Sequence, residues 1–302
     1  MSWPNLTDLL VAADSPDGRA APIGLVGAPL AAGSVTPGRC DLAPALLRAT
    51  LKRIGRFNVE TVREIETRVA DYGDVNLTGL SIEAAFEPIR DTVATSLGQR
   101  ALTLLIGGNN AITRPGLHGL AAAHGLRLDQ VGLITLDAHF DLRETGGGLS
   151  NGNPIRALLE DGLPGANISQ NGLAPFANSA AMFHDADAAG IDVATVSDCF
   201  GMGMKWIVSA ALEELDHVQA IMVDFDIDVI DRSQFPGAPG GRPGGIDASM
   251  FFEAAGILCS HPKVRLIDLT EWDPPLDPSD LSALVAGRWL AECISGFEQR
   301  SA

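Results

Sequence analysis

The chain has 302 residues, and hydrophobic residues make up 46% of them, which is enough apolar material for one large core or two smaller ones. Its formal charge of −17 argues against a nucleic-acid partner or an anionic membrane surface, because both bind through a basic patch. The four cysteines, at positions 40, 199, 259 and 293, form no closely spaced pair, which is typical of a cytoplasmic protein with buried free thiols.

The N-terminal segment does not have the features of a targeting sequence. Residues 1–19 lack a positively charged start and a long apolar run, so no signal peptide is predicted. No stretch of the chain reaches the roughly 18 apolar residues that are needed to span a bilayer. We therefore expect a cytoplasmic protein without a membrane partner.

The first hundred residues contain short apolar runs separated by turn-forming residues. Residues 22–28 predict a first strand, and apolar residues recur on one side of a predicted helix at 43–54. Residues 59–68 predict either a strand or an irregular edge segment. The sequence DYGD at 71–74 predicts a turn, and a second helix is predicted over 81–97.

From residue 102 onward, apolar strands and helices alternate regularly. Strands are predicted at 102–107, 131–137, 167–173, 191–196, 220–226 and 264–269. Helices are predicted at 113–124, 154–160, 178–189, 207–215, 250–260 and 281–294. Continuous apolar strands that alternate with helices indicate a parallel sheet covered on both faces. We predict a single α/β domain over residues 1–302.

Polar residues follow four of the predicted strands at the point where each strand ends. Asn110 follows the strand at 102–107, and Glu271 follows the strand at 264–269. The strands at 131–137 and 220–226 end in two acidic runs, DAHFD at 137–141 and DFDID at 224–228. In open α/β sheets, ligands bind beyond the carboxyl ends of the strands. We therefore expect these side chains to gather at one rim of the sheet.

The two acidic runs predict a metal site. Their polar residues are spaced i, i+2, i+4, so they lie on one face of an extended chain. Carboxylates that converge from two strands repel one another, and bound dications remove that conflict. Carboxylate and imidazole ligands suit a hard or borderline divalent metal. The alternative is a pair of strands that end in a solvated acidic loop or in helix caps, with His139 at the surface.

A pair of dications beside Glu271 would suit hydrolysis. Two bridged dications about 3.5–4 Å apart can lower the pKa of a shared water to make hydroxide, and can orient an electrophile above it. Glu271, at a neighbouring strand end, could bind a cationic amidine or guanidine group through charge-assisted hydrogen bonds. The alternative role for Glu271 is a helix cap or a rim acid beside Trp272.

Three motifs resemble the ureohydrolase family of arginases, agmatinases and formimidoylglutamases. They are DAHFD at 137–141, DFDID at 224–228 with the Pro/Gly-rich loop that follows, and LTEWDP at 269–274. The resemblance extends from IGLVGAP at 23–29 to the last predicted helix. It implies a three-layer α/β fold of the arginase type, a binuclear manganese centre, and hydrolysis of a C–N bond in a guanidino or formimidoyl group. It also implies a homo-oligomer, commonly a trimer or a hexamer.

The resemblance assigns five residues of the acidic runs to the two manganese ions. Asp137 and Asp226 would bridge both ions. Asp141 would belong to one manganese, and His139 with Asp228 would belong to the other.

Catalytic and substrate-binding roles also follow from the resemblance. Glu271 would contact the amidine-like group of the substrate, and Asp141 would help to pass a proton to the leaving group. HFDLR at 139–143, SNGNPIR at 150–156 and IDRSQFPGAPGGRPGG at 230–245 are closer to formimidoylglutamases than to arginases. In that branch the carboxylates of N-formimidoyl-L-glutamate would be held by Arg143, Asn151 and Arg242. Each of these three could instead be a surface or helix-supporting residue.

Two positions depart from the family pattern. Most of the family has Gly-Gly-Asp-His after the strand at 102–107, where this chain has Gly-Gly-Asn-Asn, so Asn110 would replace a histidine ligand. The first metal site would then be weakened, selective for another metal, or empty. Asn151 begins Asn-Gly-Asn-Pro, where arginases keep His-Gly-Thr-Pro with a proton-shuttling histidine. This second departure argues against an arginase.

The leading hypothesis is a cytoplasmic, manganese-dependent hydrolase that converts N-formimidoyl-L-glutamate and water to L-glutamate and formamide. It expects two manganese ions, or one because of Asn110, and a small-molecule substrate without a nucleic-acid partner. One alternative is a ureohydrolase for another guanidino compound, similar to an agmatinase or a guanidinobutyrase. The other is a non-catalytic protein that keeps the fold with an impaired metal centre.

Overall fold

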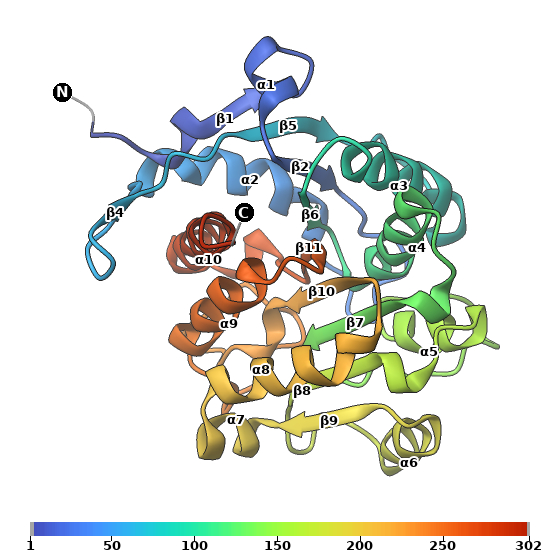
Figure 1. Cartoon of the computed structure of the whole chain (residues 1–302). Helices are drawn as coiled ribbons and strands as arrows, with labels where there is room; N and C mark the ends of the chain where they lie inside the picture. The colour runs from blue at the N-terminus through green and yellow to red at the C-terminus, as the bar shows by residue number, and fades with distance from the viewer. Residues whose placement is uncertain (1–2, 301–302) are drawn as a thin grey trace.

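The centre of the molecule is a sheet of nine parallel strands, described in a computed structural model that covers residues 3–300. The spatial order of the strands is β1-β5-β2-β6-β11-β10-β7-β8-β9 (Figure 1). Their bounds in chain order are Leu10–Ala12 (β1), Ile23–Ala28 (β2), Val69–Asp74 (β5), Leu102–Gly107 (β6), Val131–Leu136 (β7), Ile168–Leu173 (β8), Asp192–Thr195 (β9), Ala220–Asp226 (β10) and Val264–Thr270 (β11).

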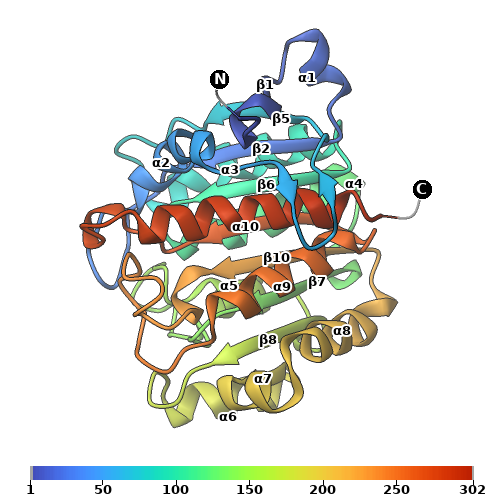
Figure 2. The same cartoon turned by 90° about the vertical axis from the view of Figure 1, so that its left-hand side faces the viewer.

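Helices cover both faces of this sheet and give the fold three layers (Figures 1 and 2). One face packs against α2 (Ala43–Thr50), α7 (Val196–Met202), α8 (Met204–Glu214), α9 (Ala248–Ser260) and α10 (Leu281–Phe297). The other face packs against α3 (Ile82–Leu97), α4 (Thr113–His124), α5 (Pro154–Asp161) and α6 (Ala180–Ala189). A short helix, α1 (Pro16–Ala20), follows β1.

The strands are continuous apolar runs because both of their faces are covered. All residues of β6 and β7 are buried, and neighbouring residues enter opposite cores. Leu104 belongs to the core under α9 and α10, while Leu105 belongs to the core under α3 and α4. This alternation follows from the two-residue period of a strand.

The register of the central strands places four carboxyl ends side by side. In the sheet β6 pairs with β11, β11 with β10, and β10 with β7. Phe225 lies opposite Leu136, and Asp226 lies opposite Thr270. The prediction that four adjacent strands bring their polar ends to one rim is therefore confirmed, as is the three-layer α/β fold.

Several predictions for the N-terminal third are wrong or incomplete. The predicted turn at 71–74 forms the last four of the six residues of strand β5, in which Gly73 has a φ of 75°. The segment at 59–68 contributes to an antiparallel pair, β3 (Phe57–Asn58) with β4 (Arg63–Glu64). The helix at 43–54 ends at Thr50 and continues as a 3₁₀ turn. Strand β1 and helices α1 and α7 were not predicted, because elements of three to seven residues are too short to show a period.

No helix within residues 3–300 combines the length and the apolar character needed to cross a membrane. The four terminal residues of the predicted domain 1–302 lie outside the described residues.

Candidate metal centre

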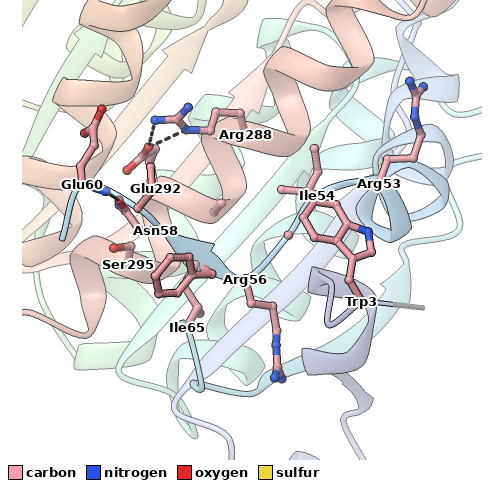
Figure 3. Close-up of a pocket in the computed structure, with 14 residues that line it drawn as sticks. Trp3, Arg53, Ile54, Arg56, Asn58, Glu60, Ile65, Arg288, Glu292 and Ser295 are labelled. Carbon is pink, nitrogen blue, oxygen red and sulfur yellow. Dashed lines mark hydrogen bonds and ion pairs between the residues drawn. The ribbon is translucent and has the colours of Figure 1, made fainter. Parts of the chain in front are cut away.

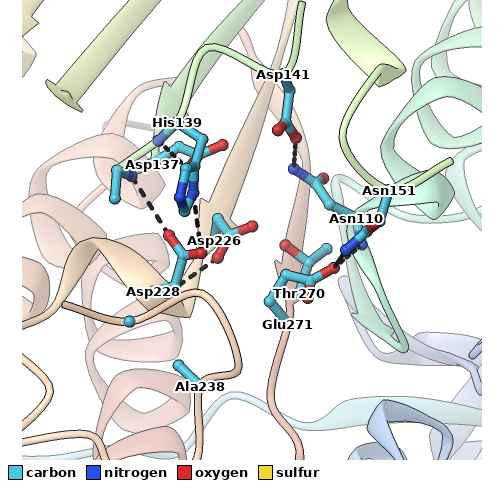
Figure 4. Close-up of polar contacts among 12 residues, drawn as sticks. Asn110, Asp137, His139, Asp141, Asn151, Asp226, Asp228, Ala238, Thr270 and Glu271 are labelled. Carbon is cyan, nitrogen blue, oxygen red and sulfur yellow. Dashed lines mark hydrogen bonds and ion pairs between the residues drawn. The ribbon is translucent and has the colours of Figure 1, made fainter. Parts of the chain in front are cut away.

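The first group of site residues consists of Asp137, His139 and Asp228, which lie at the ends of β7 and β10 (Figure 4). One ligand atom from each of the three lies within 4.8 Å of the other two. His139 Nδ1 is 3.1 Å from Asp228 Oδ2 and 3.5 Å from Asp137 Oδ1. Both carboxylates are buried, whereas the imidazole is about a quarter exposed. This arrangement offers oxygen and nitrogen donors to a single cation.

The electrostatics of this group show that its two acids draw a positive charge to the site. Burial raises the pKa of Asp137 to about 6. The negative charge of Asp228 raises the pKa of His139 to about 12, so that the imidazole is held as a cation between the two acids. Bound metal would take the place of that proton and would leave the imidazole neutral, which is the form that coordinates.

The second group contains Asn110, Asp141, Asn151 and Glu271. Asn110 Nδ2 donates to Asp141 Oδ2 at 2.7 Å. Glu271 Oε1 accepts the Asn110 backbone N–H at 2.7 Å and the Asn151 side-chain N–H at 2.8 Å. Asn151 is held in turn because its Oδ1 accepts the Val35 N–H at 2.7 Å. Burial raises the pKa of Glu271 to about 7, and it raises the pKa of Asp141 well above its usual range.

Two acids of the second group have strained backbones. Asp141 has a φ of 52° and Glu271 a φ of 61°, in the left-handed region that only a few per cent of residues other than glycine enter. Each is secured by a backbone hydrogen bond, from Arg156 N–H to Asp141 O at 3.3 Å and from Glu271 N–H to Gly108 O at 3.0 Å. Strain of this kind persists where a side chain must be aimed at a site.

Asp226 lies between the two groups in Figure 4. It is the last residue of β10 and is buried, and its Oδ1 accepts the Asp228 N–H at 2.9 Å. Burial and the charges of Asp228 and Asp137 raise its pKa well above the usual range. A buried acid in this position fits a ligand shared by two cations.

The donors fit two divalent cations of the manganese type. Five carboxyl groups, one imidazole and the amides of Asn110 and Asn151 converge here, and the His139 imidazole is the one basic group among them. Carboxylate, carbonyl and imidazole donors suit manganese. Asp137, His139 and Asp228 are the residues that could hold one cation, with Asp226 shared. Asp141 and Asn110 could contribute to the other.

The prediction that each acidic run stays extended is wrong. Strand β7 ends at Leu136, and the left-handed turn at Asp141 aims its carboxylate at Asn110 rather than at His139. In the other run, the chain from Ile227 to Val229 is a 3₁₀ turn.

Asp224 does not line the cavity described below, and its neighbour on the adjacent strand is Asp268. The two lie opposite each other in the β10–β11 register and are fully buried. Asp224 Oδ1 accepts from Thr270 Oγ1 at 3.3 Å, and Asp268 Oδ2 accepts from Thr113 Oγ1 at 2.9 Å. The remaining oxygen of each acid has no hydrogen-bond partner within residues 3–300, and burial together with the charge of Asp268 raises the pKa of Asp224 well above its usual range. Sequence reasoning missed this pair, because a buried Asp on a strand has the same pattern as a ligand.

A cavity of about 110 Å³ opens above these residues. Asp141, Asp226, Asp228 and Glu271 line its inner part, together with His139. Exposed Arg143 and Arg242 line it as well, as does Asn151. Within residues 3–300, neither guanidinium forms an ion pair or a side-chain hydrogen bond, so both are available to an anion. All ten residues predicted for the site thus lie in or directly beside one cavity.

A larger cavity of about 300 Å³ lies between the β3–β4 hairpin and the end of α10 (Figure 3). Two of its charged residues pair with each other, since Arg288 Nε donates to Glu292 Oε1 at 2.6 Å. It contains none of the residues of the metal centre.

Comparison with known proteins agrees with this geometry. Residues 21–296 match the model of the arginase family. The chain is 31% identical over 279 residues to the formimidoylglutamase of Halalkalibacterium halodurans. This match covers 90% of this chain and 86% of that protein.

Two solved structures have the same fold. The formimidoylglutamase of Bacillus subtilis superposes with a TM-score of 0.90 at 26% identity, over 99% of this chain and 94% of that one. The formiminoglutamase of Trypanosoma cruzi, solved with Mn²⁺, superposes with a TM-score of 0.89 at 24% identity, over 99% of each chain. The sequence match, the shared fold and the convergent acids lead to one conclusion: the chain belongs to the arginase family.

Proposed function

We propose that this protein is a metal-dependent hydrolase that converts N-formimidoyl-L-glutamate and water to L-glutamate and formamide. The observation that carries the proposal is a cavity with an acidic inner part and two arginines, Arg143 and Arg242, that are unpaired within residues 3–300. A substrate with a cationic amidine at one end and two carboxylates at the other matches this distribution of charge. Two of the relatives described above, from Halalkalibacterium halodurans and Bacillus subtilis, carry the name formimidoylglutamase.

We assign the metal ligands as the family resemblance implies. Asp137 and Asp226 would be shared by two Mn²⁺ ions, with Asp141 and Asn110 completing one site and His139 and Asp228 the other. When bound, the metals would supply an activated water and polarise the amidine carbon.

The remaining chemistry belongs to side chains of the chain itself. Glu271 lies against Asn110 N–H and Asn151 Nδ2, which hold its carboxylate at a fixed angle in the cavity. There it would bind the amidinium N–H groups through charge-assisted hydrogen bonds. Asp141 lines the same cavity, and its Oδ2 would carry a proton to the departing nitrogen.

Arg143 and Arg242 would select an acidic substrate. Their planar guanidinium groups match carboxylates in a bidentate geometry. The Arg143 side chain lies against Gly152, where a Cβ atom would come within 2.7 Å of Arg143 Cδ. This close packing would keep Arg143 over the cavity.

The test compares substrates of different charge on purified protein with added Mn²⁺. We expect hydrolysis of N-formimidoyl-L-glutamate and little or none of agmatine, which has no carboxylate. Arg143→Met and Arg242→Met should each raise KM for the diacid, since a hydrogen bond to a charged group contributes about 1.5–3 kcal/mol. Arg127→Met is the matched control, because Arg127 is exposed and pairs locally with Asp129. Equal activity on agmatine, or KM values unchanged in both variants, would contradict the proposed substrate.

Two other functions predict different results in the same assays. A ureohydrolase for another guanidino compound would release urea from the guanidino members of the panel. A non-catalytic protein, suggested by the amide at Asn110, would bind no manganese even in excess. Counting bound metal per chain separates this last case from both enzymes.

We also propose, from the family resemblance, a homo-oligomer of three or six chains that works in the cytoplasm. The exposed apolar residues Trp3, Phe57, Val59 and Val62 near the β3–β4 hairpin support an interface there. Light scattering coupled to size-exclusion chromatography would measure the mass of the assembly, and a monomeric mass would contradict the proposal.

A further inference from the structure

Thr113 joins Asn110 to a buried acid that lies outside the metal centre. It is the first residue of α4, and its side chain is fully buried. Thr113 Oγ1 lies 2.5 Å from Asn110 Oδ1 and 2.9 Å from Asp268 Oδ2. A line of polar groups therefore runs from the cavity, through a single hydroxyl, to the carboxyl pair inside the sheet.

The hydrogen bonds along this line of groups can run in two directions, which differ in the orientation of the Asn110 amide. In the direction seen here, the amide nitrogen of Asn110 faces Asp141, and the amide oxygen faces Thr113. When Asp268 is ionised, the single proton of the Thr113 hydroxyl then meets two acceptors, Asn110 Oδ1 and Asp268 Oδ2, and can satisfy only one of them.

In the opposite direction the Thr113 proton no longer meets two acceptors. If the Asn110 amide turns by half a rotation, its N–H donates to Thr113 Oγ1, and the Thr113 O–H donates to Asp268 Oδ2. The amide oxygen then lies beside Asp141 Oδ2. Two oxygens so close repel each other unless a cation joins them, so this direction suits the metal-loaded protein.

We propose that Thr113, supported by Asp268, is the positioning residue that turns the Asn110 amide oxygen toward the metal. An asparagine can coordinate a cation only through its oxygen, so its nitrogen needs an acceptor on the other side. The Thr113 hydroxyl is that acceptor, and Asp268 in turn accepts the hydroxyl proton. The inference rests on the proposed function, since it assumes that Asn110 and Asp141 share a cation.

Two substitutions of Thr113 distinguish a positioning role of its hydroxyl group from a packing role of the side chain. Valine has the shape of threonine without a polar atom, so Thr113→Val keeps the volume but leaves the amide nitrogen without an acceptor. Thr113→Ser keeps the hydroxyl and loses only a methyl group. A packing role predicts that both variants behave alike, whereas a positioning role predicts that serine retains metal binding and valine does not.

The experiment titrates Mn²⁺ into the metal-free full-length protein and its variants, with calorimetry for affinity and electron paramagnetic resonance for the number of bound ions. Thr113→Val should weaken one of the two binding events by roughly 10–100-fold and leave the other unchanged, as is usual when an outer-shell partner of a metal ligand is lost. Thr113→Ser should stay within a few-fold of the wild type. In an Asn110→Ala background, Thr113→Val should have no further effect on affinity.

Thr103→Val is the matched control. Thr103 is also a buried threonine with one side-chain partner, Ser96, but it lies in β6 away from the metal centre. It should lower thermal stability without changing Mn²⁺ affinity. If the wild type binds Mn²⁺ and Thr113→Val binds it equally well, the inference is wrong and the proposed function stands. If the wild type binds no Mn²⁺, both are wrong.

Discussion

At Asn110 a neutral amide occupies the position where the family pattern has an imidazole. The side chain is buried, and its two polar atoms already have partners in Asp141 and Thr113. A metal at this position must therefore compete with a hydrogen-bonded arrangement, and the amide oxygen is a weaker donor than an imidazole. We therefore propose that a metal site formed with Asp141 would be the weaker of the two.

Asn110→His should strengthen that weaker site. An imidazole at position 110 would bring a better donor to the cation shared with Asp141. Because the loss of an outer-shell partner alone changes metal affinity about 10–100-fold, a change of ligand should exceed tenfold. Calorimetric titration with Mn²⁺ measures this, and an affinity that stays the same or falls would show that Asn110 is not a ligand position.

Glu271→Gln should reduce kcat/KM without removing metal. The glutamine oxygen can still accept the N–H groups of Asn110 and Asn151, so the local geometry is kept. The charge that faces the amidinium is lost, and a hydrogen bond to a charged group contributes about 1.5–3 kcal/mol, or roughly 10–150-fold. Steady-state kinetics with metal analysis of the same samples tests this, and full activity in the variant would refute the role given to Glu271.

Among the larger elements, the loop between β10 and α9 lies against Asp228 and His139, the two residues that we propose hold one metal. Gly240 in this loop lies so close that an added Cβ atom would be 2.0 Å from Asp228 Oδ2 and 3.0 Å from His139 Cε1. The loop is also secured from within, since the Arg232 side chain donates to the carbonyl oxygens of Ala238 and Gly241, each at 3.1 Å. Its position and that of the ligands are therefore coupled.

Gly240→Ala should consequently weaken Mn²⁺ binding and lower stability. Overpacking by one methyl group typically costs about 1–3 kcal/mol. Gly146→Ala is the control, because its added Cβ atom meets nothing within 4 Å. Thermal unfolding with and without Mn²⁺ should show a smaller metal-induced rise in Tm for Gly240→Ala than for Gly146→Ala. Equal rises would mean that the loop does not hold the ligands.

The strand ends were predictable from the sequence because apolar runs define buried strands and parallel strands share one edge. Asp137, Asp226 and Glu271 followed directly from that rule. The direction of the Asp141 side chain did not follow from it, because it depends on the left-handed backbone of Asp141 itself, which no local pattern indicates. The pairing of Asp224 with Asp268 also depends on strand order, which places β11 between β6 and β10. The prediction of one domain over the whole chain stays a prediction.

For the whole molecule, the buried acids make the stability of the metal-free protein depend on pH. Asp268 and Glu271 have pKa values raised by burial to about 7, and the pKa of His139 is raised to about 12 by Asp228. A raised pKa in the folded state gives stability that is present at low pH and is lost as pH rises through the folded value. Burial lowers the pKa of His124 and His261 and acts in the opposite sense, but only below about pH 6.5.

The Tm of the metal-free protein should therefore fall between pH 6.5 and pH 8. Mn²⁺ should reverse this trend, because metal binding displaces protons from the ligands and becomes stronger as pH rises. Differential scanning calorimetry at fixed free Mn²⁺ would show a metal-induced rise in Tm that grows with pH. A rise that is independent of pH would contradict the view that metal replaces protons in this cluster.

The central claim is that the acidic cavity and its two arginines hydrolyse a formimidoyl group on a dicarboxylate. The most direct measurement follows N-formimidoyl-L-glutamate, labelled with ¹³C at the formimidoyl carbon, by NMR in the presence of the Mn²⁺-loaded protein. The label should appear in formamide as L-glutamate accumulates, and Asp226→Asn should abolish the conversion. An unchanged substrate signal in the presence of protein shown to contain bound Mn²⁺ would contradict the proposed function.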